Sequence, residues 1–197
     1  LPDADLRLAI QGSLFSGLMN NGQTCVSTTR ILLPADRYEE AVELATEYPR
    51  QLVVGDPADM ATDVGPLISA RQQRTVAGHV DRALEQGAKA TVGAGIPEGL
   101  PGFYYLPTIL RDVTPEMDIA RREVFGPVIA LIAYDTVEDA IRIANDTEYG
   151  LAAAVWGADV AQAAKVADRL VAGLKWINDV GQIDVAATPM AGRRSSG

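Results

Sequence analysis

The chain has only one cysteine and one histidine among its 197 residues. A single cysteine excludes an intramolecular disulfide and fits a reducing compartment, so we expect a cytoplasmic location. No apolar run reaches the roughly 20 residues that a membrane-spanning helix needs, and no signal peptide is visible. The sequence therefore predicts a globular domain without a membrane partner.

Basic residues are also scarce, since 17 lysines and arginines stand against 26 acidic residues and give a net charge of −9. The basic residues are scattered, which argues against nucleic acid or an anionic membrane as a partner. The length suffices for one sizeable core. The chain begins at Leu1-Pro2 without an initiator methionine and ends on the polar run 193–197. We therefore expect a piece of a longer polypeptide.

Helical and strand patterns alternate along the chain, with no internal repeat and no long linker. Helices are expected over residues 4–19, 36–47, 69–86, 136–144 and 159–172. Strands are expected over residues 28–33, 52–57, 90–92, 104–110, 128–134, 151–156 and 174–178. Capping boxes are expected at the pairs Asp36/Glu39 and Ser69/Gln72, and Thr136 and Asp139 are expected to open a helix. The alternation predicts an α/β fold with a mostly parallel sheet flanked by helices.

The single thiol, Cys25, follows the turn Asn20-Asn21-Gly22, between an apolar helical stretch and an apolar strand. A thiolate is intrinsically nucleophilic, and the backbone N–H of Cys25 could donate to an oxyanion that develops beside it. This placement suits covalent chemistry on a carbonyl carbon. The alternative is a small buried side chain without chemistry, which is the commonest use of a free cysteine.

A second unusual segment, Arg122–Val128, stands directly before the most apolar strand. Its Glu123 carboxylate offers two acceptor oxygens for hydrogen bonds. The alternative is an exposed glutamate beside a phenylalanine of the core at the entrance of a strand.

These two segments resemble motifs of the NAD(P)-dependent aldehyde dehydrogenases. Gly22-Gln23-Thr24-Cys25 resembles the nucleophile segment of that family, and Arg122–Val128 resembles its Glu-Glu-Ile/Val-Phe-Gly-Pro-Val signature, with arginine in place of the first glutamate. Further segments resemble the family in the same order, so that the resemblance covers the whole chain: Val64–Ile68, Tyr105–Leu110, Ile143–Leu151 and Pro189–Gly197.

The resemblance implies an NAD(P)-dependent oxidoreductase that converts a small-molecule aldehyde to a carboxylic acid. It implies that Cys25 is the catalytic nucleophile, which carries first a thiohemiacetal and then a thioester. It also implies that Glu123 binds the hydroxyls of the nicotinamide ribose of NAD or NADP, and that Phe125 lies against that ribose. Residues 1–197 would then form a single thiol-bearing catalytic domain of a longer, homo-oligomeric protein.

The resemblance also implies what this chain does not contain. The general-base glutamate, the oxyanion asparagine and the cofactor-binding domain are expected before Leu1, and the oligomerisation strand after Gly197. We therefore expect the isolated chain to be inactive. The alternatives are a CoA-acylating aldehyde dehydrogenase, a non-catalytic fold or assembly module, and a cysteine hydrolase based on His79. We expect His79 to be structural or exposed, Trp176 to lie in the core, and no metal site.

Overall fold

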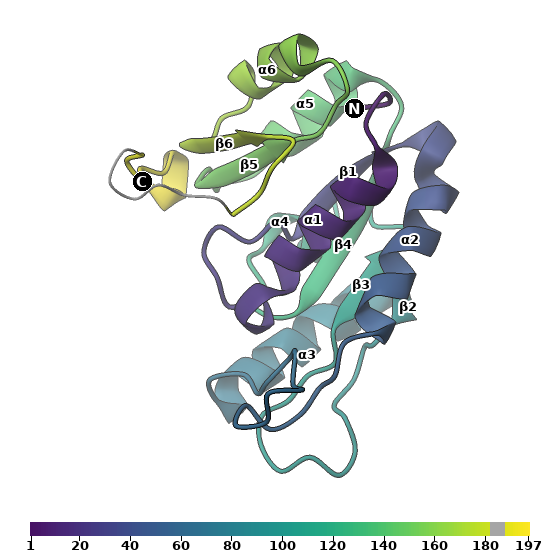
Figure 1. Cartoon of the computed structure of the whole chain (residues 1–197), viewed down its shortest axis with the longest axis vertical. Helices are drawn as coiled ribbons and strands as arrows, with labels where there is room; N and C mark the ends of the chain where they lie inside the picture. Colours follow the sequence, from purple (N-terminus) through teal and green to yellow (C-terminus); the bar gives the residue numbers. More distant parts are fainter. Residues whose placement is uncertain (182–187) are drawn as a thin grey trace.

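The computed structural model describes residues 1–181 and 188–197, and it confirms the α/β fold with a mostly parallel sheet (Figure 1). The larger sheet has the order β1-β4-β3-β2, in which β1, β4 and β3 run parallel and β2 is antiparallel to β3. The smaller sheet pairs β5 with β6 in parallel. The strands are β1 (Arg30–Pro34), β2 (Lys89–Val92), β3 (Thr108–Arg111), β4 (Val128–Tyr134), β5 (Ala152–Val155) and β6 (Leu174–Ile177).

Helices cover both faces of the larger sheet and flank the smaller one (Figure 1). The α-helices are α1 (Leu6–Leu18), α2 (Tyr38–Arg50), α3 (Ala70–Glu85), α4 (Asp118–Arg121), α5 (Val137–Asn145) and α6 (Val160–Asp168). Short 3-10 turns are η1 (Met19–Gly22), η2 (Ala35–Arg37) and η3 (Arg194–Ser196). Among the described residues, no helix combines the length and the apolarity that crossing a membrane requires.

Both faces of strand β4 are buried, because it lies between β1 and β3 and helices cover the larger sheet on both sides. Its side chains alternate between two apolar clusters: Val128, Ala130 and Ile132 pack towards α3 and α4, whereas Ile129 and Leu131 pack towards α1 and α2. This burial on two faces explains the nearly continuous apolar run that the sequence shows there.

Side-chain caps define several helix starts. The carboxylate of Asp5 accepts from the N–H of Leu8 at α1. At α5, Thr136 and Asp139 open the helix as predicted, and they do so through a reciprocal capping box. The prediction of a box at Asp36 and Glu39 is wrong: η2 precedes α2, and the Glu39 carboxylate pairs with Arg111 at 2.6 Å instead.

Some predicted boundaries also differ from the structure. The segment 52–57 forms only an isolated bridge, between Val54 and Val64. Strand β3 begins at Thr108 and not at residue 104, and its first N–H donates to the carbonyl of Pro127. Pro107 has no N–H to offer a ladder, which accounts for the later start. Helix α6 ends at Asp168, four residues before the predicted end.

Candidate active site

Cys25 lies in a turn that the backbone conformation of its predecessors makes possible. We call residues 20–27 the thiol turn. Asn20, Asn21 and Gly22 have φ angles of +52°, +58° and +69°, a region that asparagine and glycine tolerate best. The N–H of Ser27 donates to the carbonyl of Thr24 at 3.1 Å and closes the turn around Cys25. The thiol residue is exposed, so the alternative of a small buried side chain is wrong.

The loop before α3 holds the thiol turn from one side. The side-chain amide of Asn21 accepts from the N–H of Gly65 at 2.9 Å and donates to the carbonyl of Pro66 at 3.0 Å. The side-chain oxygen of Gln23 accepts from the N–H of Ile68 at 3.0 Å. Three hydrogen bonds thus fix the turn to a segment more than 40 residues away in the sequence.

The other side of the thiol turn is fixed by apolar packing and by α1. Val26, which directly follows the thiol residue, is buried in a cluster with Leu174 and Trp176 of β6. This confirms that Trp176 belongs to the core. The hydroxyl of Thr28 donates to the carbonyl of Ser13 at 2.8 Å, so that α1 holds the chain just beyond the turn.

The second candidate segment, residues 122–127, lies in contact with the thiol turn. We call it the cofactor loop, after the role that the family resemblance implies for it. Glu123 is exposed, and Phe125 has a φ of +53° and is 37% exposed. Phe125 is therefore not a core residue. A Cβ atom added to Gly22 would lie 2.0 Å from the carbonyl oxygen of Gly126, which shows that the two backbones touch. The structure thus places the two motifs side by side.

Cys25 and Glu123 both line an elongated cavity of about 530 Å³, which runs along the seam between the two sheets, with α1 and β1 on one side and α5, β5 and α6 on the other. Phe125 is not part of this lining and stands two residues further along the same loop. Arg30 lies on the wall, and its guanidinium donates to the carbonyls of Ala120 and Ala144 at 3.3 and 3.2 Å. Burial lowers the pKa of this arginine. Its role is to tie α4 to α5 beside the cavity.

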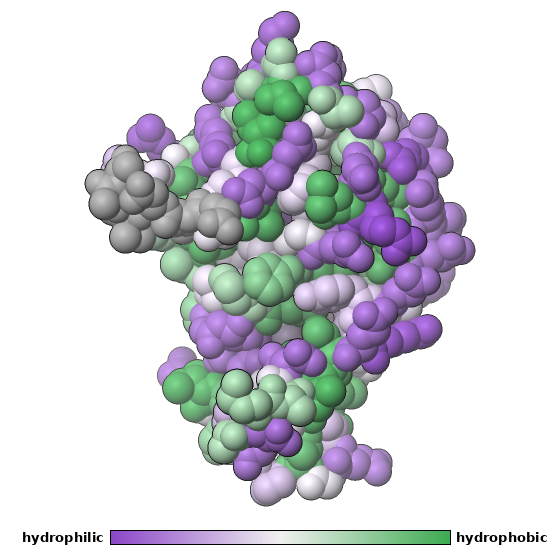
Figure 2. Space-filling model, in the orientation of Figure 1, coloured by the Kyte–Doolittle hydropathy of each residue, from purple (hydrophilic) through white to green (hydrophobic). Residues whose placement is uncertain are grey.

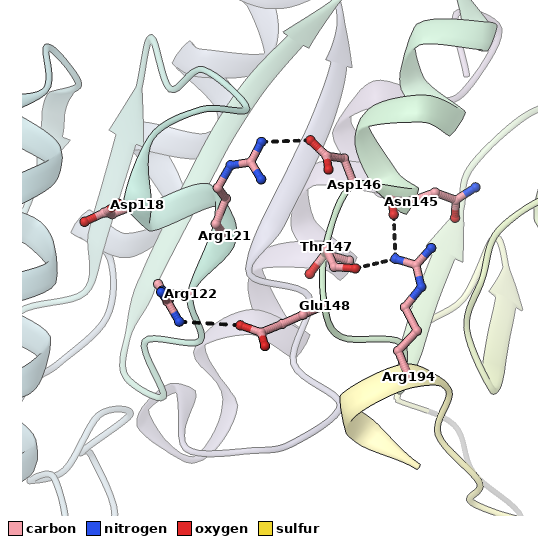
Figure 3. A pocket seen from close by; sticks show the side chains of 8 residues that line it. All are labelled: Asp118, Arg121, Arg122, Asn145, Asp146, Thr147, Glu148 and Arg194. Carbon is pink, nitrogen blue, oxygen red and sulfur yellow. Dashed lines mark hydrogen bonds and ion pairs between the residues drawn. The ribbon is translucent and has the colours of Figure 1, made fainter.

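Next to this cavity lies a more polar cleft of about 460 Å³ (Figure 3). Arg121 pairs with Asp146 at 2.9 Å, and Arg122 pairs with Glu148 at 3.5 Å. Arg122, which replaces the acidic residue of the family motif, thus has an acidic partner. Because these arginines are paired within the cleft, we interpret it as a joint between α4 and the α5–β5 connection.

Arg194 joins the C-terminal segment to the same connection. Its guanidinium donates to the carbonyl of Asn145 at 2.6 Å and also to the carbonyl of Thr147 (Figure 3). A cation at the C-terminal end of α5 also suits the negative end of the helix dipole. The segment that resembles the family's last motif is therefore fixed near the cavity wall.

The one histidine of the chain does not reach the thiol. His79 is half-buried on α3, and its ring lies 3.1 Å from the guanidinium of Arg82. Burial lowers its pKa, and the residue is not part of the Cys25 cavity. The cysteine–histidine pair that a cysteine hydrolase needs is therefore not formed. Within residues 1–181 and 188–197, no three His, Cys, Asp or Glu side chains gather as a metal site would require.

Sequence reasoning missed one residue that supports the site. Gln72 was predicted to complete a capping box with Ser69, and Ser69 does accept from the N–H of Gln72 at 3.2 Å. The side chain of Gln72, however, donates to the carbonyls of Val124 and Phe125 at 3.0 and 2.8 Å. Only one of the two hydrogen bonds of the expected capping box therefore forms. The side chain of Gln72 makes its two hydrogen bonds to the cofactor loop instead.

Comparisons with known proteins show the family of this chain. The chain matches the family model described as the aldehyde dehydrogenase family over residues 1–197. Betaine aldehyde dehydrogenase 1 of Rhizobium meliloti is 39% identical over 197 residues, which cover 99% of this chain and 40% of that protein.

Solved structures give the same answer. An aldehyde dehydrogenase of Mycobacterium tuberculosis, complexed with NAD+, matches with a TM-score of 0.96 and 46% identity over 100% of this chain and 41% of its own. Aldehyde dehydrogenase C of Pseudomonas syringae, a cysteine-to-alanine mutant complexed with NAD+ and octanal, matches with a TM-score of 0.96 and 39% identity. That match covers 100% of this chain and 41% of the other.

The chain thus spans about 40% of the length of the curated relatives that it matches. The family match nevertheless includes every residue. The structure also brings the two motif segments, the thiol turn and the cofactor loop, into contact. The chain belongs to the aldehyde dehydrogenase family.

Proposed function

We propose that residues 1–197 form the thiol-bearing catalytic domain of a longer NAD(P)-dependent aldehyde dehydrogenase, and that Cys25 is its nucleophile. The observation that carries this proposal is the shared cavity of about 530 Å³, which is lined by the exposed Cys25 and by Glu123. The family membership of the chain supports the same assignment.

In the proposed reaction, the thiolate of Cys25 attacks the carbonyl carbon of the aldehyde and forms a thiohemiacetal. The nicotinamide of NAD(P), when bound, supplies the hydride acceptor. Cys25 then holds the acyl group as a thioester, and attack by water releases the carboxylic acid and restores the thiol. The fixed thiol turn contributes by holding the sulfur at one place relative to the cavity.

Glu123 and Phe125 fit the proposed cofactor. The Glu123 carboxylate is exposed on the cavity wall and can accept from two neighbouring ribose hydroxyls. Phe125 offers an exposed ring face two residues further along. Related structures with 34% and 46% identity were solved with NAD+. We propose that these two residues bind the nicotinamide ribose.

The covalent step can be tested by stopping the full-length protein with acid during turnover with an aldehyde and NAD+ or NADP+. Peptide mass spectrometry should find the acyl group on the peptide that contains Cys25. An acyl group on any other residue would contradict the assignment. Repeating the reaction with coenzyme A separates the two dehydrogenase classes: the proposal expects the free acid, whereas an acylating enzyme yields the acyl-CoA.

The cofactor role of Glu123 predicts the kinetics of Glu123→Gln. Loss of the charged acceptor should raise the KM for the cofactor roughly tenfold, because hydrogen bonds to charged groups contribute about 1.5–3 kcal/mol. The KM for the aldehyde should change much less. Glu43→Gln is the matched control, since Glu43 is an exposed glutamate on α2 that does not line the cavity. Equal cofactor KM values in both variants would exclude the role of Glu123.

We also propose that the full-length protein is a cytoplasmic homo-oligomer. The exposed free thiol supports a reducing location. Leu8, Phe15 and Met19 are exposed on α1 and η1. Figure 2 shows hydrophobic residues among hydrophilic ones on the face of the molecule that Figure 1 views. Such side chains favour contact with further protein. Light scattering of the full-length protein should give the mass of two or more chains, and the mass of a single chain would contradict the proposed oligomer.

A further inference from the structure

The cofactor loop adopts a conformation that needs outside support. Phe125 has a φ of +53°, and an aromatic residue pays a conformational penalty of roughly 1–3 kcal/mol in this region. The loop is also exposed at Glu123 and at Phe125 itself. Its own buried side chains are Val124 and Pro127, which stand on either side of Phe125. Neither of them makes a hydrogen bond through its side chain that would fix the peptide groups of Phe125 itself.

Gln72 supplies the missing support from the first turn of α3. The two hydrogens of its side-chain amide go to consecutive carbonyls, Val124 at 3.0 Å and Phe125 at 2.8 Å. Two bonds from one planar amide group fix the orientation of both peptide units. They hold the peptide group before Phe125 and the peptide group after it, and Phe125 is the residue with the positive φ angle.

The same stretch of chain also holds the thiol turn. The residues just before α3 bind Asn21 and Gln23, as described above, through Gly65, Pro66 and Ile68. The loop 65–68 and the start of α3 therefore form one base to which both functional segments are attached. The position of Glu123 relative to Cys25 depends on this base.

We propose that Gln72 is a positioning residue, which holds the cofactor loop in the conformation that presents Glu123 and Phe125 beside Cys25. The consequence of Gln72 for cofactor binding rests on the function proposed above, whereas the effect of Gln72 on the conformation of the loop does not. Gln72 acts through the backbone of the loop and need not touch any ligand.

Gln73 provides a matched control on the same helix. Its side-chain amide also donates to a backbone carbonyl, that of Tyr104 at 2.8 Å, which belongs neither to the cofactor loop nor to the thiol turn. Gln72→Met and Gln73→Met keep the length of the side chain and remove its donors. The two variants therefore lose the same kind of bond at different loops.

The first readout is hydrogen exchange of the full-length protein without cofactor. We expect Gln72→Met to increase the exchange rate of amides in residues 122–127 at least several-fold, and Gln73→Met to leave them unchanged. The melting temperature identifies any global unfolding, and Gln72→Ala serves as a second variant if the methionine packs poorly. Unchanged exchange at residues 122–127 in a folded Gln72 variant would overturn the positioning role.

The second readout separates this inference from the proposed function. Gln72→Met should raise the KM for the cofactor about tenfold, as expected for the loss of two hydrogen bonds. The rate at which iodoacetamide alkylates Cys25 should stay within twofold of the wild-type rate. A merely structural role would change the alkylation rate as well, and that result would overturn the inference. Faster exchange in the loop with an unchanged cofactor KM would support the positioning role and refute the cofactor role of the loop.

Discussion

Tyr134 is a single side chain whose hydroxyl is buried without a partner. It ends β4 and is 5% exposed, and its oxygen has no hydrogen-bond partner within the described residues. Burial raises its pKa to about 12, and burial raises the pKa of Tyr105 to about 12 as well. Tyr38 differs, because its hydroxyl donates to the carbonyl of Leu131 and accepts from the N–H of Asp112.

These contacts predict opposite effects for two identical substitutions. Tyr134→Phe removes an unpaired buried hydroxyl and should raise the free energy of unfolding by about 1 kcal/mol at neutral pH. Tyr38→Phe removes two hydrogen bonds and should lower it by about 1–2 kcal/mol. Urea unfolding monitored by circular dichroism measures both, and destabilisation by Tyr134→Phe would contradict this description.

The raised pKa also predicts how stability depends on pH. The folded protein keeps the Tyr134 proton up to about pH 12, whereas the unfolded chain loses it near pH 10. The contribution of this bound proton to the free energy of unfolding is therefore complete below pH 10 and is lost as the pH rises through about 12. In the same urea experiments, Tyr134→Phe should lose less stability over this range than the wild type.

Single residues also show how far the sequence could be read. The exposed thiol at Cys25 could be expected from its turn-forming neighbours, and the burial of Trp176 from its size and strand position. The bonds of Gln72 could not, because a glutamine three residues after a serine fits a local cap equally well. The positive φ of Phe125 carries no local signal either, because phenylalanine is not a residue type that favours this region.

At the scale of elements, helix starts separate local from tertiary causes. The cap at α5 forms because Thr136 and Asp139 satisfy each other within one turn of chain. The predicted cap at α2 fails because Arg111, from a neighbouring strand, offers Glu39 a charged partner. The local pattern was thus sufficient at α5, whereas a distant side chain overrode it at α2. Strand β4 could be predicted to the residue because both of its faces are buried.

The capping box predicts a measurable element-level effect. Thr136→Ala removes the acceptor for the N–H of Asp139 and should lower the free energy of unfolding by about 1 kcal/mol. Thr75→Ala is the matched control, because the Thr75 hydroxyl donates to the carbonyl of Arg71 within α3 and caps nothing. The control should stay within about 0.5 kcal/mol. Equal effects in urea unfolding would mean that the cap contributes nothing special.

At the scale of the whole molecule, three segments that are distant in the sequence meet at one place. The thiol turn, the loop before α3 and the cofactor loop are joined by the bonds of Asn21, Gln23 and Gln72 and by the contact of Gly22 with Gly126. The family resemblance predicted that two of these segments belong to one site. No local pattern predicted that the third holds them together, because the contacts arise only from the folded topology.

The central claim is that Cys25 carries out the chemistry of an NAD(P)-dependent aldehyde dehydrogenase. The most direct measurement is the rate of NADH or NADPH formation by the full-length protein with a panel of aldehydes, for the wild type, Cys25→Ala and His79→Ala. We predict turnover by the wild type and by His79→Ala, and a loss of at least about a thousandfold in Cys25→Ala. Near wild-type turnover by Cys25→Ala would contradict the claim.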